Sequence, residues 1–355
     1  MSSVTKKLHT AYFFISFLAA IAGTGWMAYA ALDFGGFSLE IWLAVGAAIF
    51  VHVFLMIGAN TFCGSFLHEL GHTVFGALAG FRTVQFSIGN LIFTKHGIRY
   101  DAYSETAGAT AIFPKSEKNI RQRYAFVSLG GIVFNLVYGA VFLTLYFVLP
   151  HYPALVFFEL FAPMNLFTGL LQLLPVPNGR TDFVTFYGCI KNRPFAQIAC
   201  NILQVQSILY RRDYRAIPRG LLYDTPVIRE DDPLFIILLT LRLQYCLVLG
   251  DMEGVKEAAT RMDAIYFDEG EFVAGDVASL LYYLNKVFLG NVERAAFFKE
   301  KINKSGKSFY SCLMYAADGD EGAAEYAKKL IAKEPLYGTR EAETIMLEKI
   351  QELCP

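Results

Sequence analysis

Four long apolar blocks occupy the first half of this 355-residue chain and constrain its fold more than any other feature. They span residues 10–32, 41–80, 124–149 and 154–176. Each exceeds the roughly 20 residues that a helix needs to cross the hydrocarbon core of a bilayer. The hydrophobic content of 55% is also more than a soluble globular domain requires. The chain is therefore predicted to be an α-helical integral membrane protein with about four transmembrane helices.

The distribution of basic residues orients these helices through the positive-inside rule. Lys6 and Lys7 place the N-terminus in the cytoplasm. The connections 33–40 and 151–153 contain no Lys or Arg and are predicted to lie outside, whereas segment 81–123 carries seven basic residues and is predicted to lie inside. We therefore expect a multi-pass protein of the cell membrane with both termini cytoplasmic.

The second block is too long for a simple crossing. As one helix, its 40 residues would extend about 60 Å at 1.5 Å per residue, about twice the hydrocarbon thickness. It could kink at Gly58, tilt or project into the cytosol, or it could form two spans. Two spans would place 81–123 outside, and the seven basic residues of that segment argue against this. One crossing is the favoured interpretation.

Charge separates the chain into a membrane half and a water-soluble half. Residues 1–182 hold 10 Lys or Arg and 8 Asp or Glu, whereas residues 183–355 hold 21 and 24. The predicted domains are an N-terminal transmembrane helix with its outer loop at 1–40, a membrane core at 41–190, and a cytosolic helical domain at 191–355.

Net charge and cysteine spacing each argue against one class of site. The formal net charge of -1 gives no indication of nucleic-acid binding. The six cysteines include no C-x-x-C pair, so a cysteine zinc site is not expected.

The predicted cytosolic domain contains a loose repeat. The stretch at 249–253 recurs at 289–293 and again at 318–321, each time as a glycine-containing turn followed by acidic residues. Such turns are expected to open new helices. Stacked helical hairpins resembling tetratricopeptide repeats would follow, and because such stacks commonly bind other proteins, a regulatory protein is a candidate partner of this domain. The alternative is a compact helical domain that only stabilises the membrane part.

A small β region is predicted at 81–122, between the second and third apolar blocks. Residues 83–89 alternate polar and apolar side chains, and 91–94, 98–100 and 108–113 are further short candidates, with a turn at 96–97. Strands beside a membrane site could pair with an extended substrate through their edge hydrogen bonds. A plain cytosolic hairpin is the alternative.

The sequence H-E-x-x-H at the end of the second block carries the chemistry. Residues i and i+4 of a helix share a face, so His68 and His72 can bind one metal ion, and Glu69 lies close enough to act on a water there. Two imidazoles and an acid predict zinc. Histidines that are merely hydrogen bonded at a membrane edge are the alternative.

Zinc requires a third protein ligand, and Asp182 is the candidate. It is the one acid between residues 160 and 212, and it follows a segment containing Pro175 and Pro177. Prolines cannot continue a regular helix, so the segment could fold back toward the histidines. The alternative is an interfacial aspartate that caps the next helix.

These motifs together resemble the site-2 protease family of intramembrane zinc metalloproteases, peptidase family M50. That family pairs H-E-x-x-H with a later N-x-x-P-x-P-x-x-D-G-like segment, which 172–183 matches with Gln172 in place of the first Asn and Phe183 in place of the Gly. Residues 130–135 also resemble the family's G-P-x-x-N element. The resemblance covers roughly residues 40–190.

The resemblance implies a Zn²⁺ metalloprotease that cleaves membrane-embedded or membrane-associated substrates. It implies Glu69 as general base, zinc bound by His68, His72 and Asp182, and Asn135 as a residue that hydrogen-bonds the substrate backbone. A hydrogen bond between helices is the alternative role of Asn135. A membrane-anchored peptidase acting on soluble peptides, or a non-catalytic scaffold with a protein-binding helical domain, are the alternative functions.

Overall fold

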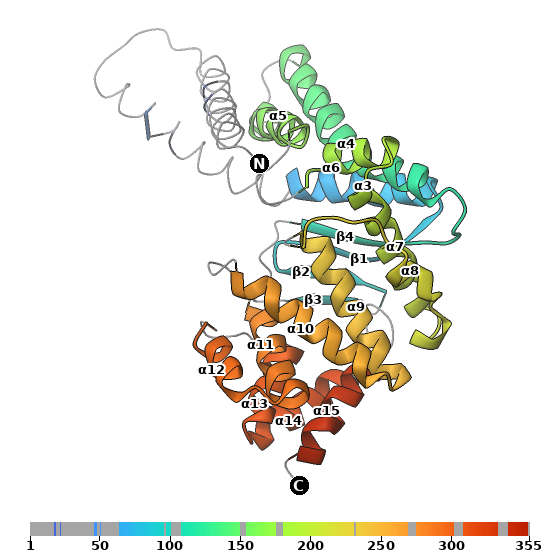
Figure 1. The fold of residues 1–355 in the computed structure, drawn as a ribbon. Helices are drawn as coiled ribbons and strands as arrows, with labels where there is room; N and C mark the ends of the chain where they lie inside the picture. Colours follow the sequence, from blue (N-terminus) through green and yellow to red (C-terminus); the bar gives the residue numbers. More distant parts are fainter. Residues whose placement is uncertain are drawn as a thin grey trace. The chain divides into compact units, whose positions relative to one another are not determined.

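The structure is a computed structural model, drawn in Figure 1. It describes most of residues 64–353 and a few isolated positions before them. The predicted block 10–32 and most of block 41–80 therefore lie outside the described residues, as does the prediction that 41–80 crosses once. Within 64–353 the gaps are 96, 101–107, 150–153, 175–179, 231, 269–274, 302–307 and 333–339.

The chain divides into two compact units, Met1–Ala196 and Gln197–Pro355. The described helices of the first unit are α3 (Ser65–Leu78), α4 (Ile120–Val148), α5 (Ala154–Leu171) and α6 (Asp182–Ile190). A small sheet lies between α3 and α4 in the sequence.

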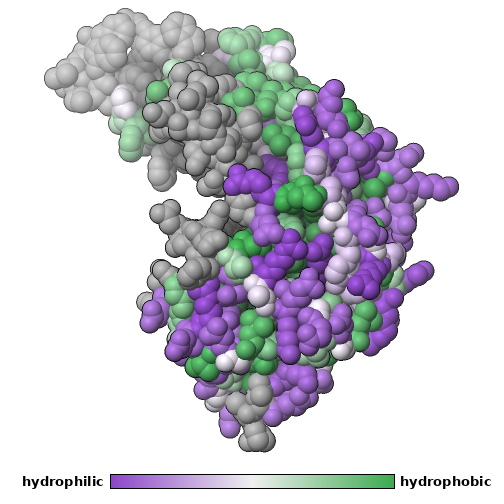
Figure 2. Space-filling model, viewed as in Figure 1, coloured by the Kyte–Doolittle hydropathy of each residue, from purple (hydrophilic) through white to green (hydrophobic). Residues whose placement is uncertain are grey.

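Helix α4 confirms the third predicted apolar block. Among the described residues it is the one helix that is long and apolar enough to cross a membrane. Val137, Phe147 and Val148 on it expose more than half of their surface, which is unusual for apolar side chains facing water. Figure 2 shows apolar side chains over the part of the molecule that contains α4, whereas polar ones dominate the C-terminal helices. Helix α5 ends at Leu171, short of the end of the predicted fourth block.

Glycines allow the helices of the first unit to approach closely. A Cβ added at Gly71 of α3 would lie 2.2 Å from the carbonyl oxygen of Gly130 in α4, so the two backbones touch at this point. A Cβ added at Gly139 of α4 would lie 2.7 Å from Leu166 of α5. Small residues at such crossings are typical of helix packing in membranes, because close approach maximises van der Waals contact.

The β region forms one antiparallel sheet in the order β3-β2-β1-β4. Its strands are β1 (Phe81–Ile88), β2 (Leu91–Thr94), β3 (Gly97–Tyr100) and β4 (Gly108–Pro114). All four predicted strands are confirmed. The predicted turn at 96–97 differs in one residue, because Gly97 is already part of β3, paired with Thr94.

Arg123, in the first turn of α4, joins this helix to the end of α3. Its guanidinium donates hydrogen bonds to the carbonyls of Ala79 at 2.5 Å and Gly80 at 2.6 Å, and to those of Ser116 and Lys118. The last carbonyls of a helix lack partners within it and carry partial negative charge. A delocalised cation therefore stabilises the end of α3 and fixes it against the start of α4.

The second unit is helical throughout its described part. Helix α7 begins just before the unit boundary, and a short π-helix, η3, continues α11. The elements are α7 (Pro194–Leu209), η2 (Tyr214–Ala216), α8 (Arg219–Tyr223), α9 (Pro233–Leu249), α10 (Met252–Asp268), α11 (Gly275–Leu284), η3 (Asn285–Leu289), α12 (Val292–Lys301), α13 (Phe309–Ala317), α14 (Glu321–Ala332) and α15 (Glu341–Leu353).

Three turns in the described part of this unit have the same construction. Each contains a glycine with positive φ, followed by an Asp or Asn whose Oδ1 accepts the N–H three residues later at 3.0 Å. Positive φ is strained for residues with a side chain, and the Asx oxygen satisfies a free donor at the helix start. The turns join α9 to α10, η3 to α12 and α13 to α14, at the three positions of the sequence repeat. The pairs are Gly250 and Asp251, Gly290 and Asn291, and Gly319 and Asp320.

Candidate metal centre

Helix α3 presents both histidines of the H-E-x-x-H motif on one buried face. The Nε2 atoms of His68 and His72 lie 3.3 Å apart, and the rings meet edge to face with centroids 4.9 Å apart. The opposite side of α3 exposes Val74 and Leu78. The i, i+4 spacing therefore places the two imidazoles as the sequence predicts.

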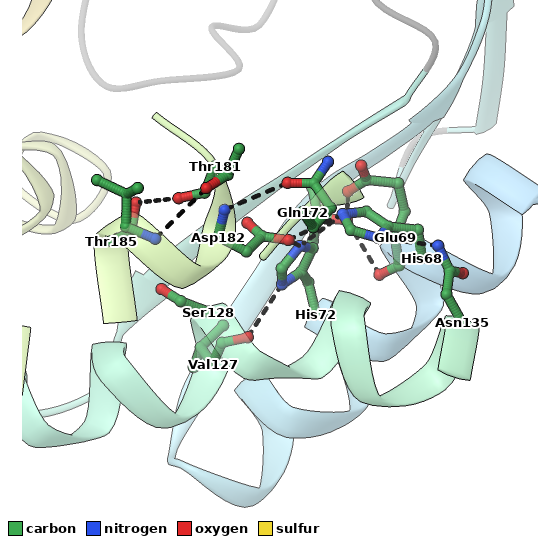
Figure 3. Close-up of polar contacts among 12 residues, drawn as sticks. His68, Glu69, His72, Val127, Ser128, Asn135, Gln172, Thr181, Asp182 and Thr185 are labelled. Carbon is green, nitrogen blue, oxygen red and sulfur yellow. Dashed lines mark hydrogen bonds and ion pairs between the residues drawn. The ribbon is translucent and has the colours of Figure 1, made fainter. Parts of the chain in front are cut away.

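Asp182 meets the two histidines from a different part of the chain. Its Oδ2 lies 3.0 Å from Nε2 of His68 and 3.1 Å from Nε2 of His72. Thr181, and not Asp182, is the N-cap of α6, because its side chain accepts the N–H of Val184. Figure 3 shows the three side chains converging from α3 and from the first turn of α6. One ligand atom from each residue lies within 4.8 Å of the others.

The hydrogen bonds around these atoms suit a bound cation. Nδ1 of His72 lies 2.9 Å from the carbonyl oxygen of Val127, so Nδ1 is the donor in this contact and Nε2 is the ring nitrogen that faces Asp182. The Oδ2 of Asp182 is buried and makes no hydrogen bond of good geometry, despite its short distances to both rings. Together with the Nε2 atoms of both rings, this oxygen forms a group that could hold a metal ion. Two imidazoles and one carboxylate are ligand types that catalytic zinc sites use.

Two residues of α4 shape the pocket of His68. Asn135 is fully buried, and its amide Nδ2 lies 3.3 Å from Nδ1 of His68. A Cβ added at Gly131 would lie 2.4 Å from the ring of His68, so only glycine leaves room for the imidazole. The structure thus brings Asn135 to the metal centre, where it contacts a histidine from the side opposite Asp182.

Two further contacts join the site to other parts of the first unit. The hydroxyl of Thr110, in β4, lies 2.6 Å from Oε2 of Glu69. The side-chain oxygen of Gln172, just after α5, accepts the backbone N–H of Asp182 at 3.3 Å. Gln172 occupies the position of the first Asn in the family motif, so the sequence indicated that this residue lies near the site. Nothing in the sequence pattern linked Thr110 to Glu69.

Comparison with known proteins adds one decisive match. The model of peptidase family M50 matches residues 62–295, about two thirds of the chain. The chain belongs to peptidase family M50. This family consists of zinc metalloproteases, generally of membranes, so membership implies that the chain is a membrane protein with metalloprotease activity. No curated protein and no solved structure matches the chain significantly.

The matched region is wider than the motifs alone suggested. It begins shortly before α3 and reaches α12, so it includes helices of the second unit as well as the metal centre. The region in which the motifs resemble the family, roughly residues 40–190, begins before the matched region and ends before it does. Part of the helical unit of this M50 protease is therefore included in the family pattern.

Proposed function

We propose that this chain hydrolyses peptide bonds of membrane-embedded or membrane-associated proteins with a zinc ion bound by His68, His72 and Asp182. The convergence of the three ligand atoms is the observation that carries the proposal. Glu69 adjoins His68 and is buried like it, as catalysis away from bulk water requires.

The chemistry divides between the ion and the carboxylate. When bound, Zn²⁺ supplies a Lewis acid that makes water more acidic and polarises the scissile carbonyl. Glu69 takes a proton from the attacking water and returns it to the leaving amine, as a general base and then a general acid. His72 keeps its orientation through Val127, and Asp182 through the first turn of α6.

The substrate must present an extended backbone, because the peptide bonds of a transmembrane helix are shielded by their own hydrogen bonds. Strand β4 supports a place for such a segment. It is an edge strand of the sheet, and its residues Gly108 and Thr110 contact Glu69. A substrate strand added beside β4 would lie next to the general base.

A pair of variants tests the assignment of roles. Glu69→Gln should retain zinc and lose cleavage of a membrane substrate, because only the proton-transfer group is removed. Asp182→Asn should bind zinc much more weakly. We expect zinc affinity to fall at least about a hundredfold, because loss of an outer-shell partner alone can lower metal affinity by that factor. Asp213→Asn, at an exposed aspartate outside the centre, is the matched control. Normal cleavage by Glu69→Gln would show that the mechanism is wrong.

The substrate itself can be found by comparing the membrane proteomes of cells that carry the wild type and Glu69→Ala. Membrane proteins that accumulate only with the variant are the expected result. Efficient cleavage of soluble peptides without detergent would instead favour a membrane-anchored peptidase. Purified protein without zinc would favour a non-catalytic scaffold.

The finer architecture belongs to the same proposal. We place about four transmembrane helices in the first unit, with both termini in the cytoplasm, and we assign the hairpins of the second unit to a tetratricopeptide-like stack. The three matching turns support this assignment. Such a stack offers a surface for a regulatory protein that controls access to the membrane part.

A further inference from the structure

The carboxylate of Glu69 is held by β4. The hydroxyl oxygen of Thr110 lies 2.6 Å from Oε2 of Glu69 and 3.1 Å from its backbone carbonyl oxygen. Hydrogen bonds to ionised groups are about twice as strong as those between neutral groups. The donor therefore fixes one of the two side-chain oxygens of Glu69. Among the described residues, the other oxygen, Oε1, accepts no hydrogen bond.

Gly108 lies against another part of the Glu69 side chain. A Cβ at this position would lie 2.8 Å from Cγ of Glu69 and 3.2 Å from its Oε1. The missing side chain therefore provides the space that Glu69 occupies. Thr110 and Gly108 stand two residues apart in β4, so they face the same side of the sheet.

The position of β4 is itself fixed by its neighbour. In the register with β1, Phe86 pairs with Thr110, and Ser87 pairs with Ala109. The buried hydroxyl of Ser87 also donates to the carbonyl of Ala109 at 3.1 Å. This bond secures the strand between the two residues that contact Glu69.

We propose that Thr110 is a positioning residue, whose hydroxyl orients Glu69 so that its free oxygen faces the reacting water. The inference rests on the proposed role of Glu69 as the general base. A glutamate side chain has several rotamers, and choosing one costs free energy. A donor already in place removes that cost from the chemical step, as preorganised groups do in enzyme sites.

Thr110→Val is the sharpest test, because valine has nearly the shape of threonine and lacks the donor. Its kcat on a membrane substrate should fall about tenfold, the size expected for one hydrogen bond to a charged group. KM and zinc content should stay unchanged, since no ligand or substrate contact is altered. Thr110→Ser keeps the hydroxyl and should restore most of kcat.

Thr94→Val provides the matched control. Thr94 lies in β2, which β1 separates from β4, and its hydroxyl bonds the carbonyl of Gly97. The same isosteric change there should leave kcat unaltered. Equal losses in Thr94→Val and Thr110→Val would indicate a general effect on the sheet and would overturn the inference.

Substitutions at Glu69 and Thr110 together distinguish the positioning role of Thr110 from the proposed function. Glu69→Ala, which removes the carboxylate, should lose cleavage whether or not Thr110 is replaced. If the wild type cleaves and Thr110→Val cleaves equally fast, the inference is wrong while the proposed function stands. If the wild type cleaves no membrane protein or peptide, the proposed function fails and the inference fails with it.

An infrared measurement gives a result that does not depend on turnover. The antisymmetric carboxylate band lost in Glu69→Gln identifies Glu69. This band should shift in Thr110→Val and keep its position in Thr110→Ser and Thr94→Val. An unshifted band in folded, zinc-containing Thr110→Val would show that the hydroxyl does not bond the carboxylate.

Discussion

Each imidazole of the metal centre uses its two ring nitrogens for different partners. In His72, Nδ1 contacts the carbonyl of Val127 and Nε2 faces Asp182. In His68, Nδ1 contacts the amide of Asn135 and Nε2 faces Asp182. The carbonyl of Val127 fixes the tautomer of His72, because only a protonated Nδ1 can donate to it, and the contact with Asn135 holds the ring of His68 in place. Helix α4 therefore sets the orientation of ligands that belong to α3.

The two roles considered for Asn135 predict different measurements. If it orients His68, Asn135→Ala should weaken zinc binding by about tenfold, the low end of the range for outer-shell partners, and leave KM unchanged. If it binds the substrate backbone, KM should rise while zinc affinity is retained. Competition with a chelator and steady-state kinetics distinguish the two. Asn165→Ala is the control, because its equally buried amide donates within its own helix, to the carbonyl of Phe161.

At the scale of elements, the crossing of α3 and α4 controls whether the centre can form. Gly71→Ala would place a Cβ 2.2 Å from the carbonyl oxygen of Gly130 and force the helices apart. We expect the free energy of unfolding to fall by about 2 kcal/mol, as overpacking typically causes, together with weaker zinc binding. Denaturation in detergent micelles measures the first effect.

Gly76→Ala, on the same helix, is the matched comparison. Its Cβ would meet Ile112 at 3.7 Å and Phe81 at 3.8 Å, which are ordinary contacts. Replacing glycine by alanine inside a helix should then stabilise the protein by up to about 1 kcal/mol. Similar destabilisation by both substitutions would argue against a specific backbone contact at Gly71.

The second unit contains a charged cluster, formed by residues of α11, η3 and α12 with the residue that follows α13, that responds to acid. Asp318, at the end of α13, accepts bonds from Lys286 and Lys299, both at 2.5 Å, and from the hydroxyl of Tyr282. Partial burial acts to raise the pKa of the Asp318 carboxyl. The bonds from Lys286, Lys299 and Tyr282 outweigh it and lower the pKa to about 2, from an ordinary 3.8.

The sign of the pH effect follows from this depressed pKa. Asp318 stabilises the folded chain fully above the unfolded pKa, and this contribution is lost as the pH falls through the folded value. Asp318→Asn should therefore destabilise the protein by a constant amount above about pH 4. The difference from the wild type should shrink between pH 4 and pH 2. Unfolding curves across this range measure it, and a difference independent of pH would contradict the prediction.

The sequence was informative where structure is set locally. Alternation identified β1, and helical spacing placed His68 and His72 together, because both patterns follow from backbone geometry alone. Asp182 could be named because acids are scarce in its region. The contact between Thr110 and Glu69 could not be predicted, since it depends on how β4 pairs with β1 and how the sheet packs on α3. The end of α5 was also placed too late, because apolar residues continue beyond the helix.

At the scale of the whole molecule, the predicted orientation of the chain in the membrane can be tested by labelling cysteines on either side. In a background without Cys63 and Cys354, Tyr152→Cys should react with a membrane-impermeant maleimide in intact cells. Lys191→Cys should react only after permeabilisation, since the connection 151–153 is predicted outside and the chain beyond α6 inside. Four other cysteines are buried and should react little; these are Cys189, Cys200, Cys246 and Cys312. Labelling of both positions from the same side would contradict the predicted crossing.

The backbone contact between Gly71 and Gly130 also determines how the centre responds to its membrane. Helices that already touch cannot move closer, so a thinner or thicker bilayer is accommodated by a change of tilt. In such a rotation, each atom moves in proportion to its distance from the pivot. His72 directly follows Gly71, and His68 precedes it by three residues, about 4.5 Å along the axis at 1.5 Å per residue. The two ligands thus lie almost on the pivot, and their geometry is preserved while the helix ends swing.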